Sequence, residues 1–308
     1  MSSPIEKRVG ISTHFLPSTY GETLEEAVKI VSDAGIACFE LVPTGQAQIG
    51  YPYNYANVGL WPRSLSASDK KSLRNILSVF DICTVHGPHL DLNIASYNMG
   101  IREESIRQYM ECMELAADLE VEVVTFHMGG QTRGYIRDRE EIVRYNVEFA
   151  RKASDSAESH GMKVGYETGS CRDLEKIFEE FSPAEFGLNL DIGHTIMQGV
   201  NPVSMMEQWK DRLIEIHFNG VCQYWGGFME HVPIYRNNAL DYQEIIQKMK
   251  EIEFEGPIIC ELQGNDIKQA CEAGLEAREL ITRLWEGPEH KEKVKPWNLL
   301  KFLQSEKG

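Results

Sequence analysis

The stretch LNLDIGHTIMQG, residues 188–199, combines the pattern of a buried strand with a polar end. Its first residues are apolar at Leu188 and Leu190, and Asp191, Gly193 and His194 follow where such a strand should end. Seven other short apolar runs occur along the chain. The eight runs cover residues 9–13, 38–42, 82–86, 121–127, 163–168, 186–193, 213–218 and 257–262. Most of them lack strict polar–apolar alternation, which is typical of parallel strands covered by helices.

Segments with helical periodicity separate these runs. Residues 23–34, for example, place Leu24, Val28 and Val31 on one face, and Thr23 precedes them as a candidate N-cap. The predicted helices cover residues 23–34, 69–80, 103–119, 140–160, 173–180, 203–210, 241–252 and 266–285. Eight strands that are each followed by a helix predict an α/β fold of the (β/α)₈ TIM-barrel type. A doubly wound sheet is the alternative, but it needs a glycine-rich turn that STHFLPSTYG, residues 12–21, does not contain.

The length of 308 residues suits one large barrel, and no Pro/Gly/Ser linker divides the chain. We therefore expect a single domain over residues 1–308, with a barrel core at about residues 8–285. Residues 286–308 would form a C-terminal extension. Together with the residues just before it, this extension offers a candidate helix for a homodimer contact.

Charge and composition argue against several classes of protein. The net charge is −16, without a basic cluster that would favour nucleic acid. The seven cysteines are scattered and form no C-x-x-C pair, which argues against a zinc finger or a disulfide framework. The chain has no apolar run of membrane-spanning length and no signal-peptide pattern. These observations predict a cytoplasmic protein that binds neither membrane nor nucleic acid.

Two predicted connections are long and aromatic. Residues 43–68 follow the second strand and include Trp61, and residues 219–240 follow the seventh and include Trp225. Loops of this length at the carboxyl ends of barrel strands favour a role as lids or binding walls. The alternative is that their aromatic side chains pack outside the barrel or in a subunit interface.

Six consecutive strands, the third to the eighth, end in a histidine or an acid. Because the carboxyl ends of barrel strands share one rim, these side chains should converge there. A single histidine or glutamate at such a position is more often structural, but buried carboxylates are costly unless paired or bound to a cation. The predicted set consists of His86, His127, Glu167, Asp191, His194, His217 and Glu261.

This set suits a divalent metal ion. A site built from Glu167, Asp191, His217 and Glu261 would offer mixed oxygen and nitrogen ligands, suited to Mn²⁺, Co²⁺, Mg²⁺ or Zn²⁺. Such an ion lowers the pKa of a carbon acid next to a carbonyl, and nearby carboxylates could remove and return the proton. His86 and His127 either hold a second metal bridged by Glu167 or hydrogen-bond the substrate.

The ordered motifs VHGPH, FHMGG, YETG, LDIGH, IHFNG, HVP and ICEL resemble the xylose isomerase-like barrel superfamily, over about residues 8–285. That superfamily includes sugar isomerases and epimerases, inosose dehydratases and endonuclease IV. The resemblance to the ketose 3-epimerase branch implies that Glu167, Asp191, His217 and Glu261 are metal ligands. It also implies that the two glutamates are the catalytic acid/base pair and that His194 contacts substrate oxygens.

In the endonuclease IV branch, the resemblance implies a three-zinc site for which this chain keeps eight of nine ligands. Met229 stands where the ninth, an aspartate, is expected, and the adjacent Glu230 is predicted to point elsewhere. The glycines of the turn that follows His231 in both branches are also absent from HVPIYRN, residues 231–237. These departures and the negative charge argue against DNA repair.

Four functions follow from this sequence. The first is a metal-dependent isomerase or epimerase of a sugar, keto-sugar or polyol, and the second is a lyase or dehydratase on the same site. An endonuclease IV-type phosphodiesterase and a non-catalytic binding protein are the other two. For the first, the predicted substrate-binding residues are His86, His127, His194, His231, Trp61 and Asn219.

Overall fold

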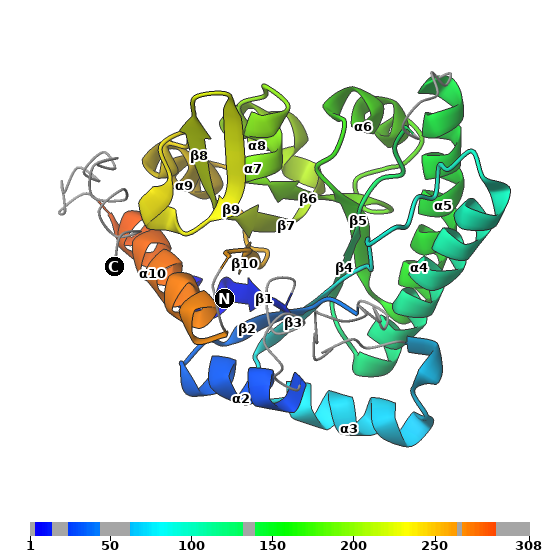
Figure 1. The fold of residues 1–308 in the computed structure, drawn as a ribbon, viewed down its shortest axis with the longest axis horizontal. Helices are drawn as coiled ribbons and strands as arrows, with labels where there is room; N and C mark the ends of the chain where they lie inside the picture. Colours follow the sequence, from blue (N-terminus) through cyan, green and yellow to red (C-terminus); the bar gives the residue numbers. More distant parts are fainter. Residues whose placement is uncertain (1–3, 14–23, 44–61, 132–138, 264–266, 288–308) are drawn as a thin grey trace.

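Eight parallel strands close into a barrel in the computed structural model of the chain, which describes residues 4–13, 24–43, 62–131, 139–263 and 267–287 (Figure 1). Around the barrel the strands follow the order β1-β10-β7-β6-β5-β4-β3-β2. Their bounds are β1 Val9–Ser12, β2 Cys38–Leu41, β3 Ile82–His86, β4 Val123–Phe126, β5 Lys163–Glu167, β6 Gly187–Asp191, β7 Leu213–Phe218 and β10 Ile258–Cys260. Each lies within or overlaps one of the eight predicted runs, so the predicted TIM barrel is confirmed.

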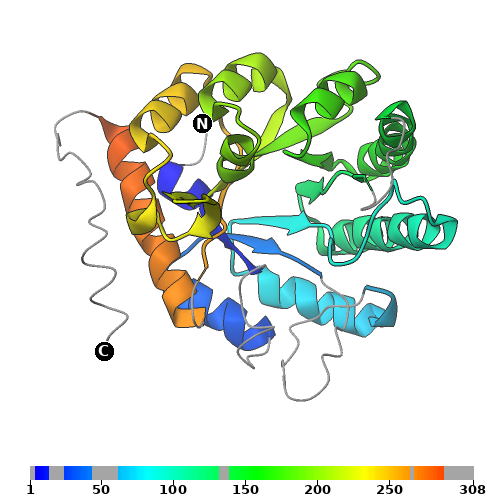
Figure 2. The ribbon, with the colours of Figure 1, turned by 45° about the horizontal axis from the view of Figure 1, so that its top comes forward.

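Helices surround the barrel and cover its outer face (Figure 2). Eight of them correspond to the predicted ones: α2 Leu24–Asp33, α3 Ala67–Leu77, α4 Met99–Leu119, α5 Arg139–His160, α6 Cys171–Phe178, α8 Pro202–Trp209, α9 Tyr242–Glu251 and α10 Ile267–Glu286. The short helices α1 Ile5–Arg8 and α7 Ile192–Met197 and the 3₁₀ turns η2 Pro62–Ser64, η3 Lys210–Arg212 and η4 Ile234–Arg236 are additional. No helix in these described ranges has the length and apolarity needed to span a bilayer.

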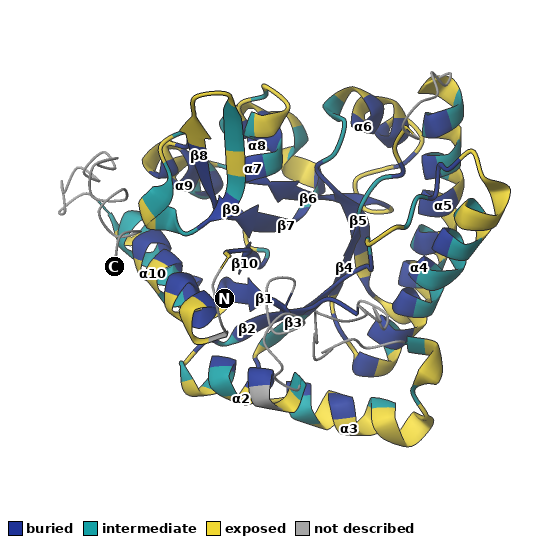
Figure 3. Ribbon diagram, in the orientation of Figure 1, coloured by how far each residue is buried: buried dark blue, intermediate teal, exposed yellow. Residues whose placement is uncertain are grey.

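The helices turn a buried face towards the strands and an exposed face outward, as the burial colours of Figure 3 show. The buried face is mainly apolar. Between β4, β5 and their helices, Tyr109, Phe126, Phe149 and Tyr166 form a chain of ring contacts, with Tyr109 and Phe126 stacked at 4.7 Å between centroids. All four side chains are at most 2% exposed. This packing fixes the two strands that deliver His127 and Glu167 to the rim.

Several helices begin at a polar residue whose side chain caps the first turn. Ser66 caps α3 in a capping box with Asp69, and Asn98 caps α4 by accepting hydrogen bonds from Gly100 and Ile101. Asp191 ends β6 and caps α7, because its Oδ1 accepts a hydrogen bond of 2.7 Å from the backbone N–H of His194. The polar end of the 188–199 stretch is therefore a strand-to-helix turn.

The predicted loop over residues 219–240 is not a continuous loop. It contains an antiparallel hairpin of β8 Gly220–Tyr224 and β9 Gly227–Val232, and β9 packs against α7. Tyr224 and Trp225 at the hairpin tip are exposed. Residues 44–61 of the other predicted aromatic loop, including Trp61, and residues 288–308 of the predicted extension lie outside the described residues.

Candidate active site

Four buried side chains converge at the carboxyl ends of β5, β6, β7 and β10. Glu167 and Asp191 are the last residues of their strands, His217 is the fifth residue of β7, and Glu261 directly follows β10. The register pairs Asp191 with His217 across neighbouring strands. All four are at most 2% exposed, and each offers a ligand atom within 4.8 Å of the others. The structure thus brings together the four predicted metal ligands.

His217 lies at the centre of this group. Its Nδ1 is 2.9 Å from Glu167 Oε1, 3.3 Å from Glu261 Oε2 and 3.9 Å from Asp191 Oδ2. Three carboxylates around one imidazole nitrogen form a compact anionic group with oxygen and nitrogen donors. That donor set fits a divalent cation. The cation would be bound by the carboxylate oxygens and the imidazole nitrogen that contact one another in its absence.

The charges in the group explain its pKa shifts. Burial opposes the charged form of His217, but Glu261, Glu40 and Glu167 outweigh it and raise the pKa of that imidazole well above its usual value. Burial likewise favours neutral Glu167, but His194, His127 and His217 hold the pKa of its carboxyl well below the usual range. Positively charged neighbours therefore stabilise the ionised carboxyl of Glu167, and a bound cation would have the same effect.

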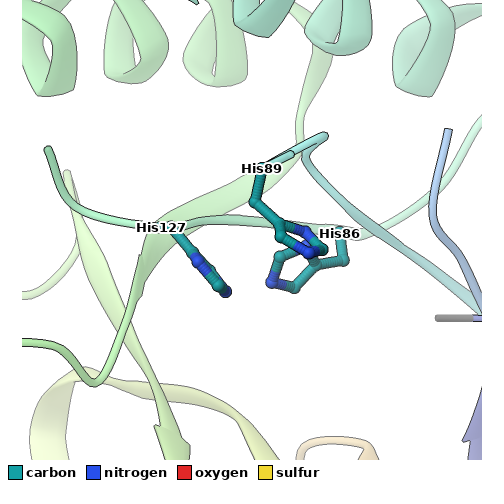
Figure 4. Close-up of side chains that lie close together, drawn as sticks. All are labelled: His86, His89 and His127. Carbon is teal, nitrogen blue, oxygen red and sulfur yellow. The ribbon is translucent and has the colours of Figure 1, made fainter. Parts of the chain in front are cut away.

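A second group consists of three histidines from the strand-3 and strand-4 side of the rim. His86, His89 and His127 offer nitrogens within 4.8 Å of one another, and their rings lie close together (Figure 4). His127 Nε2 lies 2.5 Å and His86 Nε2 lies 3.3 Å from Glu167 Oε2. Glu167 therefore joins this group to the first one. Sequence reasoning missed His89, although its three-residue spacing from His86 in VHGPH was a usable signal.

A third group lies between α7 and β9 and contains Asp191, His194 and His231. His231 has a left-handed backbone, with φ of 57°, within an irregularity where three residue steps of β9 oppose two of β8. Such a bulge re-aims side chains that would otherwise alternate between faces. Glu230 Oε2 consequently lies 3.9 Å from His194 Nε2, so the prediction that Glu230 points elsewhere was wrong. Met229 is 41% exposed.

A cavity of about 440 Å³ opens at one side of the carboxylate group. Its walls come from the loops after β4 and β5 and from the starts of α5 and α6. Glu167, His127 and His194 line its inner part. Arg139 lines it too, with its guanidinium held by Asp173 at 2.9 Å and by the Ser170 hydroxyl at 2.8 Å. No residue of the β8–β9 hairpin is among the described residues that line the cavity.

The side-chain amide of one buried residue, Asn146, holds the loop after β4 in place. Asn146 of α5 accepts a hydrogen bond of 2.8 Å from the backbone N–H of Gly129 and donates one of 2.9 Å to the Gly129 carbonyl. A β-carbon at Gly129 would lie 2.5 Å from the backbone nitrogen of Ala95, so only glycine fits. These contacts fix the cavity wall next to His127.

Asn219 and Gly193 support Asp191 from the other side. The Asn219 amide donates a hydrogen bond of 2.8 Å to Asp191 Oδ2 and is fully buried. A β-carbon at position 193 would lie 2.4 Å from Asn219 Oδ1, so a larger residue there would displace the amide that holds Asp191. His86, His231 and Asn219 do not line the cavity, and substrate contact by these three residues remains a prediction. Trp61, the other predicted substrate-binding residue, lies outside the described residues.

Fold and site together define a class: (β/α)₈ barrels with clustered carboxylates and imidazoles at the carboxyl ends of their strands. Comparison with known proteins places the chain within it. The model of the xylose isomerase-like TIM barrel family matches residues 28–284, and the chain belongs to that family.

Individual similarities are more distant. The uncharacterized protein MJ1311 of Methanocaldococcus jannaschii is 26% identical over 243 residues, which are 75% of this chain and 80% of that protein. A D-tagatose 3-epimerase-like protein has a similar structure, with a TM-score of 0.70 and 23% identity over 90% of this chain and 97% of its own. The zinc-bound IOLI protein has a TM-score of 0.69 and 16% identity, covering 90% and 99%. At these identities the structural likeness concerns the fold.

Proposed function

We propose that the protein is a divalent-metal-dependent isomerase or epimerase that acts on a sugar, keto-sugar or related polyol. The observation that carries this proposal is the position of Glu167. Its carboxylate belongs to the four-residue ligand group and also lines the cavity, where a small polar molecule would meet it. The epimerase-like and zinc-bound structures of the same fold support the choice of reaction and of a metal.

The proposed reaction removes one proton from the substrate and adds another. One glutamate, Glu167 or Glu261, starts as the carboxylate and takes the proton from the carbon next to a carbonyl, and the other starts protonated and donates its own proton to the opposite face of the resulting enediolate. A divalent ion held by Glu167, Asp191, His217 and Glu261 would supply the positive charge that makes this carbon acid more acidic. Mn²⁺, Co²⁺, Mg²⁺ and Zn²⁺ all suit the mixed donor set.

The remaining side chains are assigned to binding and orientation. His127 and His194 line the cavity and would hydrogen-bond substrate hydroxyls, while Asn219 holds Asp191. Arg139 is held in place by Asp173 and would bind oxygens at the outer end of the substrate. A second metal ion at His86 and His127 is also proposed, with His89 as a further ligand, because three imidazoles in this arrangement suit Zn²⁺.

The test is exchange of a substrate C–H hydrogen with solvent deuterium, followed by NMR across a panel of keto-sugars. Mn²⁺-loaded protein should exchange at least one member of the panel, and chelated protein should not. Absence of exchange over the whole panel, with metal bound, would contradict the proposal. A matched surface variant such as Glu158→Gln, exposed on α5, should behave as the parent protein does.

A lyase is the second candidate, because the cavity continues from Glu167 past Ser170 to Asp173 and Arg139. That space would accommodate a leaving group beyond the reacting carbon. The lyase shares the first proton transfer and differs only in that the enediolate then expels a substituent. Mass spectrometry separates the two reactions, since only the lyase forms an α,β-unsaturated product that has lost mass.

A further inference from the structure

The interior of the barrel beneath the rim is unusually polar. Glu40 of β2, Thr84 of β3, Asn189 of β6 and Glu215 of β7 are all fully buried, at 0% exposure. The strand register pairs Glu40 with Thr84 and Asn189 with Glu215. Branched apolar side chains normally fill such layers of a TIM barrel. Two carboxylates in this place need a physical explanation.

The two carboxylates approach the same nitrogen of one imidazole. Glu40 Oε2 lies 3.2 Å and Glu215 Oε2 lies 4.0 Å from Nε2 of His217. Each of the three residues offers a ligand atom within 4.8 Å of the others. His217 therefore separates two acidic groups: its Nδ1 faces the rim carboxylates, and its Nε2 faces this inner pair.

The inner pair has too few partners for its charge. Glu40 Oε1, both carboxylate oxygens of Glu215 and the Asn189 carbonyl oxygen make no hydrogen bond of normal geometry within the described part of the chain. Burial and the charge of Glu40 raise the pKa of the Glu215 carboxyl, and the nearby Thr84 hydroxyl offsets this only in part. His217 brings at most one positive charge to two carboxylates. Buried polar atoms without partners are rare and commonly mark an ion or a water that completes the site.

We propose that Glu40 and Glu215 hold a further, inner cation beneath the rim group, a hard divalent ion such as Mg²⁺ or Mn²⁺. Oxygen donors with two negative charges match such an ion, whereas a softer ion would prefer sulfur or several imidazoles. The Thr84 hydroxyl lies beside Glu215, and the Asn189 amide nitrogen lies 2.7 Å from Nε2 of His217. Their side-chain oxygens would complete the oxygen shell. The inner cation site differs from the rim group and from the three-histidine group, and it does not depend on the reaction proposed above.

The rival explanation is a proton. Burial and the negative charge of Glu40 raise the pKa of Glu215 to about 8, so a neutral Glu215 would also reduce the repulsion. The two explanations predict different density between the carboxylates. An ion lies about 2.0–2.6 Å from several oxygens at once, whereas a shared proton brings two oxygens into hydrogen-bond contact.

The first experiment is a crystal of the full chain grown with MnCl₂, with an anomalous difference map recorded at the manganese edge. We expect a peak between Glu40 and Glu215 that is separate from any peak among Glu167, Asp191 and Glu261. A map without the inner peak, with a water or a carboxyl–carboxyl hydrogen bond at that place, overturns the proposal. Because the parent chain is used, this result does not depend on how any variant folds.

The second experiment counts bound Mn²⁺ in solution by electron paramagnetic resonance. Glu215→Gln keeps the size of the side chain and removes its charge, so it should bind one ion fewer per chain than the parent protein. Asp191→Asn should keep the inner ion and lose the rim ion, and Glu158→Gln should bind as many ions as the parent. An unchanged count in Glu215→Gln contradicts the inner site.

Glu40→Gln is the second variant if Glu215→Gln does not fold, and it should lose the same ion. Both outcomes are independent of catalysis. If the rim ion and deuterium exchange are present but the inner ion is absent, only the inner site is disproved. If the inner ion is present without exchange on any substrate, only the proposed reaction is disproved.

Discussion

Oε1 of Glu167 lies 2.9 Å from Nδ1 of His217, although both side chains are almost fully buried. The contact joins the ends of β5 and β7, which are not neighbours in the barrel. Because the surrounding packing is dense, the donor atoms are already assembled before any ligand arrives. We therefore expect the metal site to be preformed in the folded protein.

Metal binding should stabilise the folded protein. An ion that binds only the native state contributes about 2.7 kcal/mol at one hundred times its Kd. We expect Mn²⁺ to raise the melting temperature of the parent protein in thermal denaturation and to raise that of Asp191→Asn much less. Asp191 is a suitable position because its two oxygens already orient the site through His194 and Asn219. An equal shift in both proteins would remove Asp191 from the ligand group.

The metal-free protein should lose stability as the pH rises. Burial opposes the charge on His86, but Glu167 outweighs it and raises the pKa of His86 from 6.5 to about 9. A raised folded-state pKa gives stability that is complete below pH 6.5 and is lost between pH 6.5 and about pH 9. For one such group the loss is at most roughly 3 kcal/mol.

This pH dependence is measured as the melting temperature of chelated protein from pH 6 to 9.5, beside that of His86→Asn. The variant should show a flatter curve over this window. Saturating metal should also flatten the curve of the parent protein, because the cation then takes over the role of the proton. A melting temperature that rises through the window in chelated protein would contradict the assignment.

Arg139 should affect substrate binding more than turnover. Its guanidinium is held by Asp173 and Ser170, and Arg139 is not one of the four residues of the rim carboxylate group. Arg139→Ala should raise KM about tenfold with a smaller change in kcat, since it removes binding present in both ground and transition states. Arg139→Lys should recover part of the loss. A fall in kcat at unchanged KM would instead place Arg139 in the chemical step.

Asn146 should be important for stability as well as for the site. Its side chain makes hydrogen bonds to both backbone groups of Gly129 and to the Ile142 carbonyl. Asn146→Ala leaves these buried groups unpaired, which should cost about 2–4 kcal/mol in urea unfolding. Asn75→Ala, at an exposed position, should change the free energy of unfolding by less than about 0.5 kcal/mol. Equal effects would show that the Asn146 contacts contribute little.

The strands and the convergence of the rim side chains were predictable from sequence for one reason. Parallel barrel strands end at a common edge, so a residue's place at the end of a strand determines where its side chain goes. That rule identified Glu167, Asp191, His217 and Glu261 before any coordinates. It says nothing of the residues two positions earlier, and Glu40 and Glu215 looked like ordinary strand positions.

The remaining features depend on local backbone geometry. The β8–β9 hairpin was expected as a loop because its strands carry mixed polar residues and little periodicity. Glu230 faces His194 only because the bulge at His231 breaks the alternation of β9. A register irregularity of this kind depends on how β9 packs against β8 and α7. It cannot be predicted from the sequence of β9 alone. His89, by contrast, followed from its spacing to His86 and was overlooked.

The most direct test of the central claim is solvent deuterium exchange at the substrate carbon, compared between Mn²⁺-loaded parent protein and Glu167→Gln. Loss of a positioned acid/base group should slow exchange by about 10²–10⁴-fold. Glu261→Gln should slow it comparably, while Glu158→Gln should exchange at the parent rate. Exchange that continues at the parent rate in Glu167→Gln, with the metal still bound, would contradict the account.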